Sequence, residues 1–385
     1  MRCQASPEIA ELVRPEASGR VARHLNHAAA GDEPGRTEDG ATRDEARKGR
    51  EEIMAEPALL ADHSEIEPIG QPFHAVGSQS CWAVVLAGGE GMRLRPLVRQ
   101  VLGDDRPKQY VRLLGSRTLL RQTLDRIALA IPSTRTLVVT VRRHAGYIAE
   151  EFAGTAQPTV LTQPLDRGTA AGVLYPAHWI AWRNPEATVA VFPSDHFLLG
   201  EAPFMAHVSE VAAWVDKHPE RLVLLGAQPT SPEVEYGWIE PDVSLGVLST
   251  GAIRAVRQFW EKPSAARARA CLEAGHLWNT SVMVGKVVTL LQTGWQALPE
   301  LSDRLTRIEP LIGTPEEAGA LRQAYELMPK ANFSRSVLEA CPELLAVSRL
   351  PRIVWSDLGS PHRVMEALTR LRIRPEWAPP LASSA

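Results

Sequence analysis

Hydrophobic and amphipathic segments alternate along the chain from Trp82 onward. Short apolar runs typical of buried strands occupy residues 82–87, 137–141, 159–162, 188–192 and 222–226. Segments with helical periodicity lie between them, at 118–130, 144–152, 169–182 and 203–217. Short strands that alternate with helices are typical of βαβ units around a mostly parallel sheet that is buried on both faces. We therefore predict an α/β fold in which helices flank such a sheet.

The pattern changes after residue 226. Further strands are expected at 236–240, 253–260, 278–284 and 344–348. Further helices are expected at 263–274, 286–307, 314–328 and 361–370. The higher frequency of strands between residues 236 and 284 predicts a smaller, β-rich region beside the first set of βαβ units.

The first 80 residues differ in composition from the rest. Residues 1–70 contain 9 Lys or Arg and 15 Asp or Glu, with only scattered apolar residues. Such a segment buries too little apolar surface to offset the entropy lost on ordering, so we predict that residues 1–80 are a disordered polar extension. An alternative is that Met54 is the true start and residues 1–53 are an over-called reading frame. One folded domain is predicted over residues 81–372, followed by a Pro-rich tail at 373–385.

Composition argues against several classes of protein. The 385 residues include 42 Lys or Arg and 45 Asp or Glu, a formal net charge of −3, so no general attraction to nucleic acid or to an anionic membrane is expected. Cys3, Cys81, Cys271 and Cys341 form no C-x-x-C pair, which argues against a disulfide framework and against structural zinc. No apolar run reaches the roughly 18 residues of a membrane span. We expect a cytoplasmic protein.

A glycine-rich loop follows the first predicted strand and reads Gly88-Gly89-Glu90-Gly91-Met92-Arg93. Ligands of open α/β sheets bind beyond the carboxyl ends of the strands. Glycines allow backbone N–H groups to approach a phosphate, and Arg93 adds positive charge. The loop is not a Walker loop, because no Gly-Lys-Ser/Thr follows, and it lacks the third glycine of the dinucleotide fingerprint. A tight turn that binds no ligand explains the three glycines equally well.

Six further polar segments carry candidate chemistry, at 105–110, 163–170, 191–197, 259–263, 277–281 and 355–360. Lys108 can act as a compact point charge on a phosphate. Asp195 and Asp357 can bind Mg²⁺, which prefers oxygen ligands. Each segment also has a purely structural interpretation, for example a solvated surface lysine at 108 or a helix cap at Thr169. The order of the segments is more informative than any one of them.

Taken in order, the segments resemble the sugar-1-phosphate nucleotidyltransferases, and among these the mannose-1-phosphate guanylyltransferases. Residues 88–97 are similar to the family's Gly-Gly-x-Gly-Thr-Arg-Leu-x-Pro-Leu loop, and residues 107–109 to its Pro-Lys-Gln segment. Three further segments resemble the guanylyltransferase branch in particular: Arg-Gly-Thr-Ala at 167–170, Pro-Ser-Asp-His-Phe at 193–197 and Tyr-Gly-Trp-Ile-Glu at 236–240. Glu-Lys-Pro at 261–263, Trp-Asn at 278–279 and Trp-Ser-Asp-Leu-Gly-Ser at 355–360 complete the series, which covers about residues 81–372.

The resemblance implies a Rossmann-like domain of the nucleotide-diphospho-sugar transferase type, with a smaller sugar-binding β-rich region. Its nucleotide-binding half would span about 81–226 and its sugar-binding half about 227–372. Such a domain joins a sugar 1-phosphate to a nucleoside triphosphate and releases pyrophosphate. The implied substrates are GTP and mannose 1-phosphate, the implied product is GDP-mannose, and the implied cofactor is Mg²⁺. A homo-oligomer is compatible with the resemblance.

The resemblance also implies roles for individual residues. Arg93, Lys108 and Asp195 would be catalytic, with Arg93 facing the departing pyrophosphate, and Asp195 and Asp357 would hold the metal. Lys262 would grip the sugar phosphate. The implied nucleotide contacts are Gly88, Gly89, Gly91, Gln163, Gly168 and Thr169. The implied sugar-phosphate contacts are Gly237, Glu261, Lys262 and Asn279.

Departures from the family pattern bear on the choice of substrate. Met92 replaces the signature Thr, Arg95 replaces the Trp usual in guanylyltransferases, and Thr280-Ser281 stands where Ser/Ala-Gly is common. The loop at 98–105 also differs from the family pattern. None of these changes removes a charge that the reaction needs. The alternatives are the same reaction with another nucleotide or hexose 1-phosphate, a non-catalytic regulator that binds a nucleotide sugar, and, more distantly, a dinucleotide-dependent oxidoreductase.

Overall fold

The computed structural model describes residues 81–155, 158–375 and 377. These residues belong to one compact unit, Ala75–Ala385. The predicted extension at 1–80, the alternative start at Met54 and most of the predicted tail lie outside the described residues. The division of 81–372 into a nucleotide-binding and a sugar-binding half stays a prediction.

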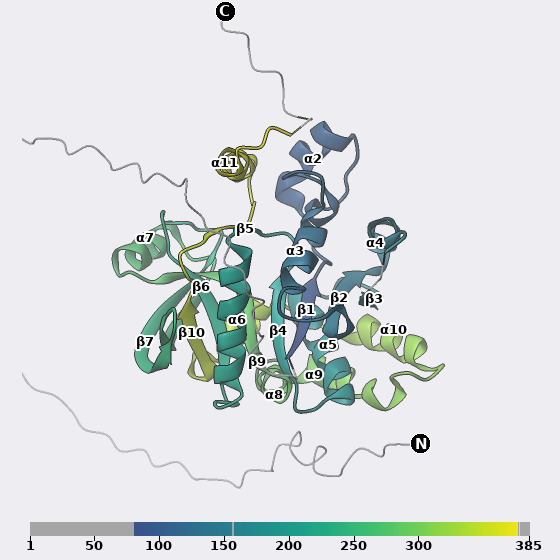
Figure 1. The fold of residues 1–385 in the computed structure, drawn as a ribbon. Helices are drawn as coiled ribbons and strands as arrows, with labels where there is room; N and C mark the ends of the chain where they lie inside the picture. Colours follow the sequence, from purple (N-terminus) through teal and green to yellow (C-terminus); the bar gives the residue numbers. More distant parts are fainter. Residues whose placement is uncertain (1–80, 156–157, 376, 378–385) are drawn as a thin grey trace, which may run out of the picture. The chain divides into compact units, whose positions relative to one another are not determined.

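A nine-stranded, mostly parallel sheet forms the centre of the described residues, with the strand order β3-β2-β1-β4-β9-β6-β10-β8-β7 (Figure 1). The prediction of an α/β fold built on such a sheet is confirmed. Its strands are β1 Cys81–Leu86, β2 Thr136–Val141, β3 Thr159–Gln163, β4 Thr188–Pro193, β6 Leu222–Ala227, β7 Gly237–Leu248, β8 Gly251–Glu261, β9 Leu277–Lys286 and β10 Leu345–Arg349. A separate two-stranded sheet pairs β5 (Phe197–Leu199) with β11 (Val354–Ser356).

Strand β9 joins the two halves of the large sheet. Strands β3, β2, β1 and β4 run parallel to one another, and β9 pairs antiparallel with both β4 and β6. Strands β4 and β6 therefore point in the same direction. The carboxyl ends of β1, β3, β4 and β6 meet at one edge of the sheet, which is where open α/β sheets bind ligands.

Helices cover both faces of the sheet (Figure 1). Side chains alternate across a strand, so Trp82 and Val84 pack with α5, α8, α9 and α10, whereas Ala83 and Val85 pack with α3, α4, α6 and α7 on the other face. The bounds are α3 Leu119–Ile127, α4 Ala145–Phe152, α5 Thr169–Arg183, α6 Glu201–Val215, α7 Ala265–Glu273, α8 Val287–Ala297, α9 Pro299–Thr306 and α10 Glu317–Leu327.

A third apolar cluster lies beyond the carboxyl edge of the sheet. It joins α2 (Arg95–Leu102) and α11 (Pro361–Leu371) through Val98, Val364 and Leu368, and it includes Leu94 and Leu358. The glycine-rich loop and the segment that follows β11 are thereby packed against each other, although they lie near opposite ends of the described chain.

The structure corrects two local predictions. The single helix predicted at 286–307 is two helices, because Leu298 has φ −139° and ψ 61° and Pro299 begins α9. Proline lacks an N–H for the helical hydrogen bonds and is favoured at the first position of a helix, where Pro299 stands. The segment at 98–105, interpreted from sequence as a reshaped loop, contains most of α2, which ends at Leu102 before Gly103 in the left-handed region.

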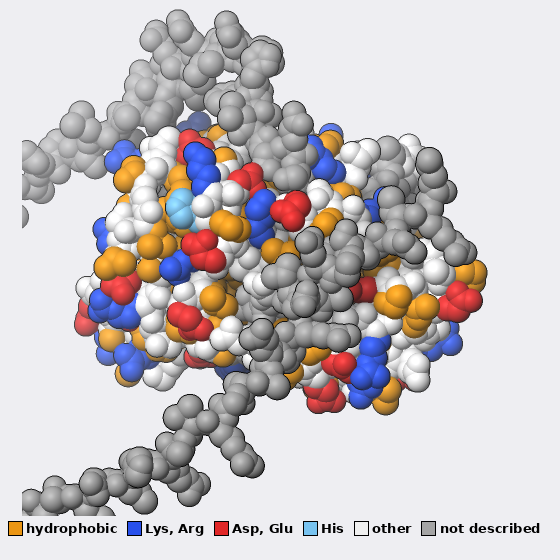
Figure 2. Space-filling view, turned by 90° about the horizontal axis from the view of Figure 1, so that it is seen from below, with side chains coloured by type: hydrophobic (Ala, Val, Ile, Leu, Met, Phe, Trp, Pro, Cys, Tyr) orange, Lys and Arg blue, Asp and Glu red, His pale blue; other side chains and the backbone are white. Residues whose placement is uncertain are grey.

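Charge is dispersed on the face seen in Figure 2. Lys and Arg side chains lie among Asp and Glu side chains outside the grey atoms, with no large patch of one sign. This agrees with the small formal net charge. Among the described residues, no helix is both long and apolar enough to cross a membrane.

Candidate active site

The glycine-rich loop is fixed by the Pro-Lys-Gln segment. Gly91 has φ +60°, and a Cβ there would lie 3.0 Å from the backbone nitrogen of Lys108, so the two segments approach too closely for a larger residue. The Gln109 Nε2 donates hydrogen bonds to the backbone oxygens of Ala87 (3.0 Å) and Gly89 (2.8 Å). The loop is therefore held in place without any ligand.

A central cavity of about 270 Å³ lies beside this loop and includes Gly91, Arg93, Lys108, Asp195 and Asp357 in its lining. Lys108 is buried, with an exposed fraction of 6%. Its Nζ lies 3.1 Å from Asp195 Oδ2 and donates a hydrogen bond of 2.5 Å to the backbone oxygen of Asp357. A fixed cation therefore joins the two carboxylate residues that the sequence singled out.

The carboxylate of Asp357 is held by four donors. Its Oδ1 accepts hydrogen bonds from the Tyr236 hydroxyl (2.7 Å), the backbone N–H of Gly359 (2.9 Å) and the Arg363 guanidinium (2.8 Å). Its Oδ2 lies 3.2 Å from Arg93 Nη2. Arg363 also pairs with Glu233 and lies over the Tyr236 ring. The orientation of this carboxylate is thus set before any substrate arrives.

Opposite charges keep Asp357 ionised. Burial raises the pKa of its carboxyl, but the charge that His196 carries once it is protonated in acid, the hydrogen bond from Tyr236 and the charges of Lys108 and Arg363 outweigh burial and lower the pKa to about 2. The neighbouring His196 has its pKa lowered to about 4, chiefly by burial. At neutral pH the cavity therefore contains an ionised carboxylate and an uncharged imidazole.

Two exposed cations share one carboxylate at the rim of the central cavity. Glu235 Oε2 lies 3.6 Å from Arg93 Nη1 and 3.3 Å from Lys262 Nζ. Each of the two cationic side chains is about half exposed, so both can reorient toward a ligand. The sequence predicted a role for Arg93 and for Lys262 but gave no reason to single out Glu235.

The predicted sugar contacts converge at the ends of neighbouring strands. Gly237 begins β7 opposite Glu261 of β8, and a Cβ on Gly237 would lie 3.1 Å from Glu261 Oε2 and 3.1 Å from the Cβ of Asn279. The lack of a side chain at 237 keeps this corner open. Burial raises the pKa of Glu261. Asn279 is buried on β9, and its Oδ1 accepts a hydrogen bond from the backbone of Ser281.

A second cavity, of about 490 Å³, lies on the other side of the glycine-rich loop; we call it the glycine-loop cavity. Gly88, Gly89, Gln163, Gly168 and Thr169 line it. These are predicted nucleotide contacts, and the structure brings them to one cavity. Gly91, the remaining predicted nucleotide contact, faces the central cavity instead.

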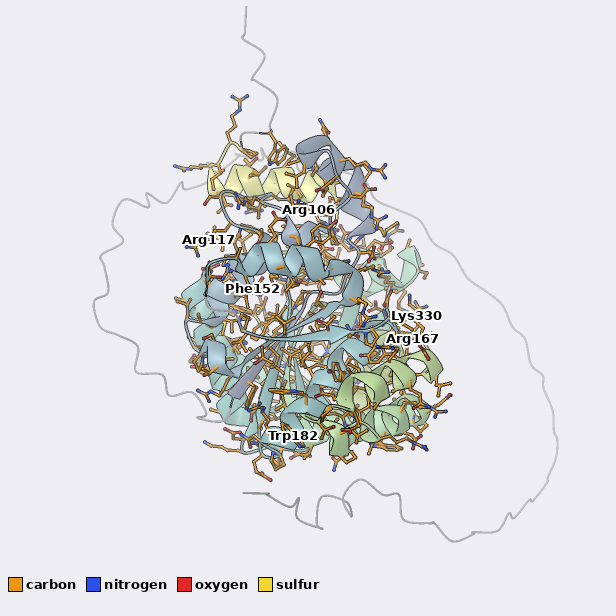
Figure 3. The ribbon with its side chains drawn as sticks, turned by 90° about the vertical axis from the view of Figure 1, so that its right-hand side faces the viewer. Arg106, Arg117, Phe152, Arg167, Trp182 and Lys330 are labelled. Carbon is orange, nitrogen blue, oxygen red and sulfur yellow. The ribbon has the colours of Figure 1, made fainter. Side chains whose placement is uncertain are left out.

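Residues 330–332 complete the wall of the glycine-loop cavity. A Cβ on Gly168, where φ is +83°, would lie 2.2 Å from the backbone oxygen of Ala331. Two backbone hydrogen bonds tie Ala331 to Arg167 and Ala170, and Thr169 Oγ1 accepts a third from the N–H of Phe333. Lys330 lines the cavity, whereas the nearby Arg167 (Figure 3) donates hydrogen bonds to the backbone oxygens of Tyr325 and Glu326. The sequence contained no signal for this segment, because Ala331 carries no reactive group.

The two substituted positions of the loop differ in exposure: Met92 lies toward solvent, whereas Arg95 is half-buried. Met92 is 59% exposed. Arg95 forms an ion pair of 2.7 Å with Glu90, whose other carboxylate oxygen lies 2.5 Å from Arg143. The replacement of Trp by Arg at 95 therefore adds charge beside Glu90, which also lines the glycine-loop cavity.

The donor set of the central cavity fits Mg²⁺ in its chemistry. Among the described residues, no group of three or more His, Cys, Asp or Glu side chains gathers into a metal site. Asp195 and Asp357 offer carboxylate oxygens, and Mg²⁺ commonly takes one or two carboxylates and completes its shell with water and substrate phosphates. Arg93 donates a hydrogen bond to Asp357 Oδ2 in this structure, so a metal ion bound there would share this oxygen with Arg93 or displace it.

The family model described as nucleotidyl transferase matches residues 82–372. The chain belongs to this family. The prediction made from the ordered motifs is therefore confirmed at the level of the family. Nucleotidyltransferases generally use a divalent metal, which agrees with the carboxylates of the central cavity.

Curated relatives are similar to this chain over most of its length. A mannose-1-phosphate guanylyltransferase of Sinorhizobium fredii is 29% identical over 284 residues, which are 72% of this chain and 52% of the relative. The xanthan biosynthesis protein XanB of Xanthomonas campestris is 29% identical over 283 residues, 72% of this chain and 57% of the relative. This chain thus spans about half the length of the curated relatives it matches.

A crystal structure described as mannose-1-phosphate geranyltransferase, from Thermus thermophilus, is similar in fold and sequence. The TM-score is 0.62 at 28% identity, and the match covers 77% of this chain and 80% of that chain. The predicted fold class is therefore supported by an experimental structure as well as by the strand order described above.

Proposed function

We propose that this chain transfers a nucleotidyl group from a nucleoside triphosphate to a sugar 1-phosphate. The observation that carries the proposal is the central cavity, where buried Lys108 lies between Asp195 and Asp357 and Arg93 stands at the rim. Phosphate transfer requires alignment of the reactants and neutralisation of charge more than covalent help from the protein. Family membership supports this reaction class.

The proposed step is an in-line displacement at the α-phosphorus of the triphosphate. An oxygen of the sugar 1-phosphate forms a new bond to this phosphorus while the bond to the bridging oxygen of the β-phosphate breaks. Pyrophosphate leaves with the electron pair, so no proton transfer is needed. Lys108 would stabilise charge near the α-phosphate, and Arg93 would stabilise the departing pyrophosphate. Lys262 would bind the phosphate of the sugar.

Mg²⁺ is the proposed cofactor, held by Asp195 and Asp357. When bound, it would act as an electrostatic clamp between the two phosphate groups. The protein's contribution is to keep both carboxylates ionised and oriented. For Asp357, Tyr236, Gly359 and Arg363 supply the hydrogen bonds that do so.

GTP and mannose 1-phosphate are the proposed substrates, and GDP-mannose the proposed product. Relatives named mannose-1-phosphate guanylyltransferase support this choice. The glycine-loop cavity, with Gln163, Gly168 and Thr169, would receive the base, and Gly237, Glu261 and Asn279 would face the sugar. The size of the cavity, about 490 Å³, is within the range usual for small-molecule sites.

The test is pyrophosphate release by the purified full chain with Mg²⁺, across the four common nucleoside triphosphates and several hexose 1-phosphates. Dominant release with GTP and mannose 1-phosphate would support the whole proposal. Dominant release with another pair would keep the reaction and replace the substrates. No release with any pair, while GDP-mannose still raises the melting temperature, would favour a non-catalytic regulator instead.

A further inference from the structure

A third cavity, of about 1220 Å³, lies under α11; we call it the α11 cavity. Its walls are α11, the connection between β10 and β11, and the connection between β6 and β7. Figure 1 shows α11 above the end of the sheet on the side of β6 and β10. The α11 cavity shares Arg93 and Gly359 with the central cavity. It does not include the predicted nucleotide contacts or the predicted sugar contacts, and the proposed reaction gives it no role.

Three arginines of the α11 cavity have no acidic partner. Arg349, Arg352 and Arg370 are exposed and line the cavity. Within the described part of the chain, none of them forms an ion pair or a side-chain hydrogen bond. A guanidinium presents a planar fork of donors that matches a phosphate in two simultaneous hydrogen bonds. Positive charge is therefore available here for an anion from solution.

Two of the three carboxylates of the same cavity already have cationic partners. Glu233 lies 2.7 Å from Arg363, and Glu235 is shared by Arg93 and Lys262. The third, Glu366, lies 3.8 Å from the His362 imidazole and offsets at most one of the three arginine charges. The wall also contains aromatic rings, those of Tyr236, Trp278 and Trp355, which suit the organic part of a ligand.

We propose that the α11 cavity binds a small organic phosphate as a second ligand, at a site separate from both substrates. Nucleoside diphosphates and sugar phosphates share the required chemistry, a phosphate group with two negative charges on a polar or planar body. Arg349, Arg352 and Arg370 bind the phosphate. The aromatic wall excludes water from the organic part.

Arg363 connects this site to the central cavity. Its side chain lines the α11 cavity, and its guanidinium donates the 2.8 Å hydrogen bond to Asp357 Oδ1. An anion in the cavity attracts the same guanidinium and competes with Asp357 for it. Occupancy therefore loosens the carboxylate that is proposed to hold the metal, and it lowers turnover. This consequence rests on the proposed function, whereas binding itself does not.

Direct binding tests the site. Calorimetric titrations of the full chain measure the affinity for three probes: GDP, glucose 6-phosphate and inorganic phosphate. The wild type is compared with the triple variant Arg349→Gln/Arg352→Gln/Arg370→Gln. The single variant Arg352→Gln serves as the second variant if the triple variant has a lower melting temperature. The control variant is Arg269→Gln/Arg322→Gln, two exposed arginines of α7 and α10 that do not line the α11 cavity.

At least one organic phosphate is expected to lose about tenfold in affinity or more in the triple variant and to keep its wild-type affinity in the control. If only the affinity for GDP falls in the triple variant, the ligand is a nucleotide. If the affinity for glucose 6-phosphate falls, the ligand is a sugar phosphate. Equal affinities in wild type and triple variant would overturn the proposal. So would equal binding of inorganic phosphate and both organic probes.

Turnover is the second readout. Glucose 6-phosphate carries its phosphate on C6 rather than on C1, so it is not a sugar 1-phosphate substrate and can be added to the pyrophosphate assay as an effector. The rate of the wild type is expected to fall at least about twofold at saturation, and the rate of the triple variant is expected not to change. If no substrate pair gives turnover, the proposed function fails, but the calorimetric result still decides whether the site exists.

Discussion

Lys108 and Asp195 form an ion pair beneath the glycine-rich loop, with Nζ and Oδ2 3.1 Å apart. Lys108 is 8% exposed in its side chain and Asp195 26%, so the cation is buried and the carboxylate faces the central cavity. This asymmetry suits a site in which the protein fixes the positive charge and leaves the carboxylate accessible to a ligand. Mutation of Asp195 therefore tests the site more directly than mutation of the buried Lys108.

Asp195→Asn should abolish most of the turnover while the protein remains folded. The amide keeps the shape of the side chain but loses the charge proposed to bind Mg²⁺. Loss of one preorganised charge contact at a transition state typically costs roughly 10²–10³ in rate. Pyrophosphate release measures the effect, and circular dichroism verifies the fold. Asp303→Asn, which affects an exposed ion pair with Arg307, is the matched control. Near-parental turnover of Asp195→Asn would remove Asp195 from the mechanism.

Glu235→Gln should improve binding of the sugar phosphate. Glu235 holds Arg93 and Lys262 in the absence of substrate, so an incoming phosphate must displace it from both cations. Exposed ion pairs are worth about 0–1 kcal/mol, so KM for the sugar 1-phosphate should fall by at most about fivefold. The KM is obtained from initial rates at saturating triphosphate.

Glu220→Gln provides the control for this measurement. Glu220 is exposed and pairs only loosely with Arg221, at 3.8 Å, so its neutralisation changes net charge by the same amount without freeing a cation of the site. A higher KM in Glu235→Gln would show instead that Glu235 positions Arg93 or Lys262 for the substrate.

Local motifs predicted much of the fold and of the site. Each predicted strand of the large sheet is present, because alternating apolar runs and turn residues are local signals. The position of β9 between β4 and β6 was not predictable in this way, since strand order depends on contacts between distant parts of the chain.

The same limit applies to two candidate site residues, Arg363 and Ala331, that the sequence did not reveal. Arg363 belongs to an ordinary amphipathic helix, and its link to Asp357 exists only because α11 packs over the end of the sheet. Ala331 closes the glycine-loop cavity with its backbone alone.

Stability should decrease as the pH falls from about 6.5 to about 4. His207 is buried, and burial lowers its pKa from 6.5 to about 4. Because the folded pKa lies below the unfolded pKa, the unfolded state binds more protons in this window, and stability rises with pH across it. The contribution of one such histidine is at most about 3 kcal/mol. Urea unfolding at several pH values measures it.

Substitution of His207 isolates this contribution. In His207→Gln the loss of stability between pH 6.5 and 4 should be smaller than in the wild type, although hydrogen bonds to Thr250 and Ser348 are changed at every pH. His362→Gln is the control, because it removes an exposed imidazole and leaves the buried one in place. An identical pH dependence in all three proteins would mean that His207 titrates normally in the folded state.

Gly168→Ala should damage the glycine-loop cavity. Gly168 has φ +83° and ψ −180°, a conformation essentially restricted to glycine, and Gly275 has φ +74°, so an alanine is strained at either position. At Gly275 no atom lies within 4 Å of the new Cβ, whereas at Gly168 the backbone oxygen of Ala331 lies 2.2 Å away. Residues 330–332 must therefore move in Gly168→Ala, and they form the wall proposed to face the base.

We expect Gly168→Ala to lose more stability than Gly275→Ala in urea unfolding and to raise KM for the triphosphate, while Gly275→Ala keeps the wild-type KM. Equal losses of stability and unchanged KM in both variants would contradict the assignment of residues 330–332 to the nucleotide site.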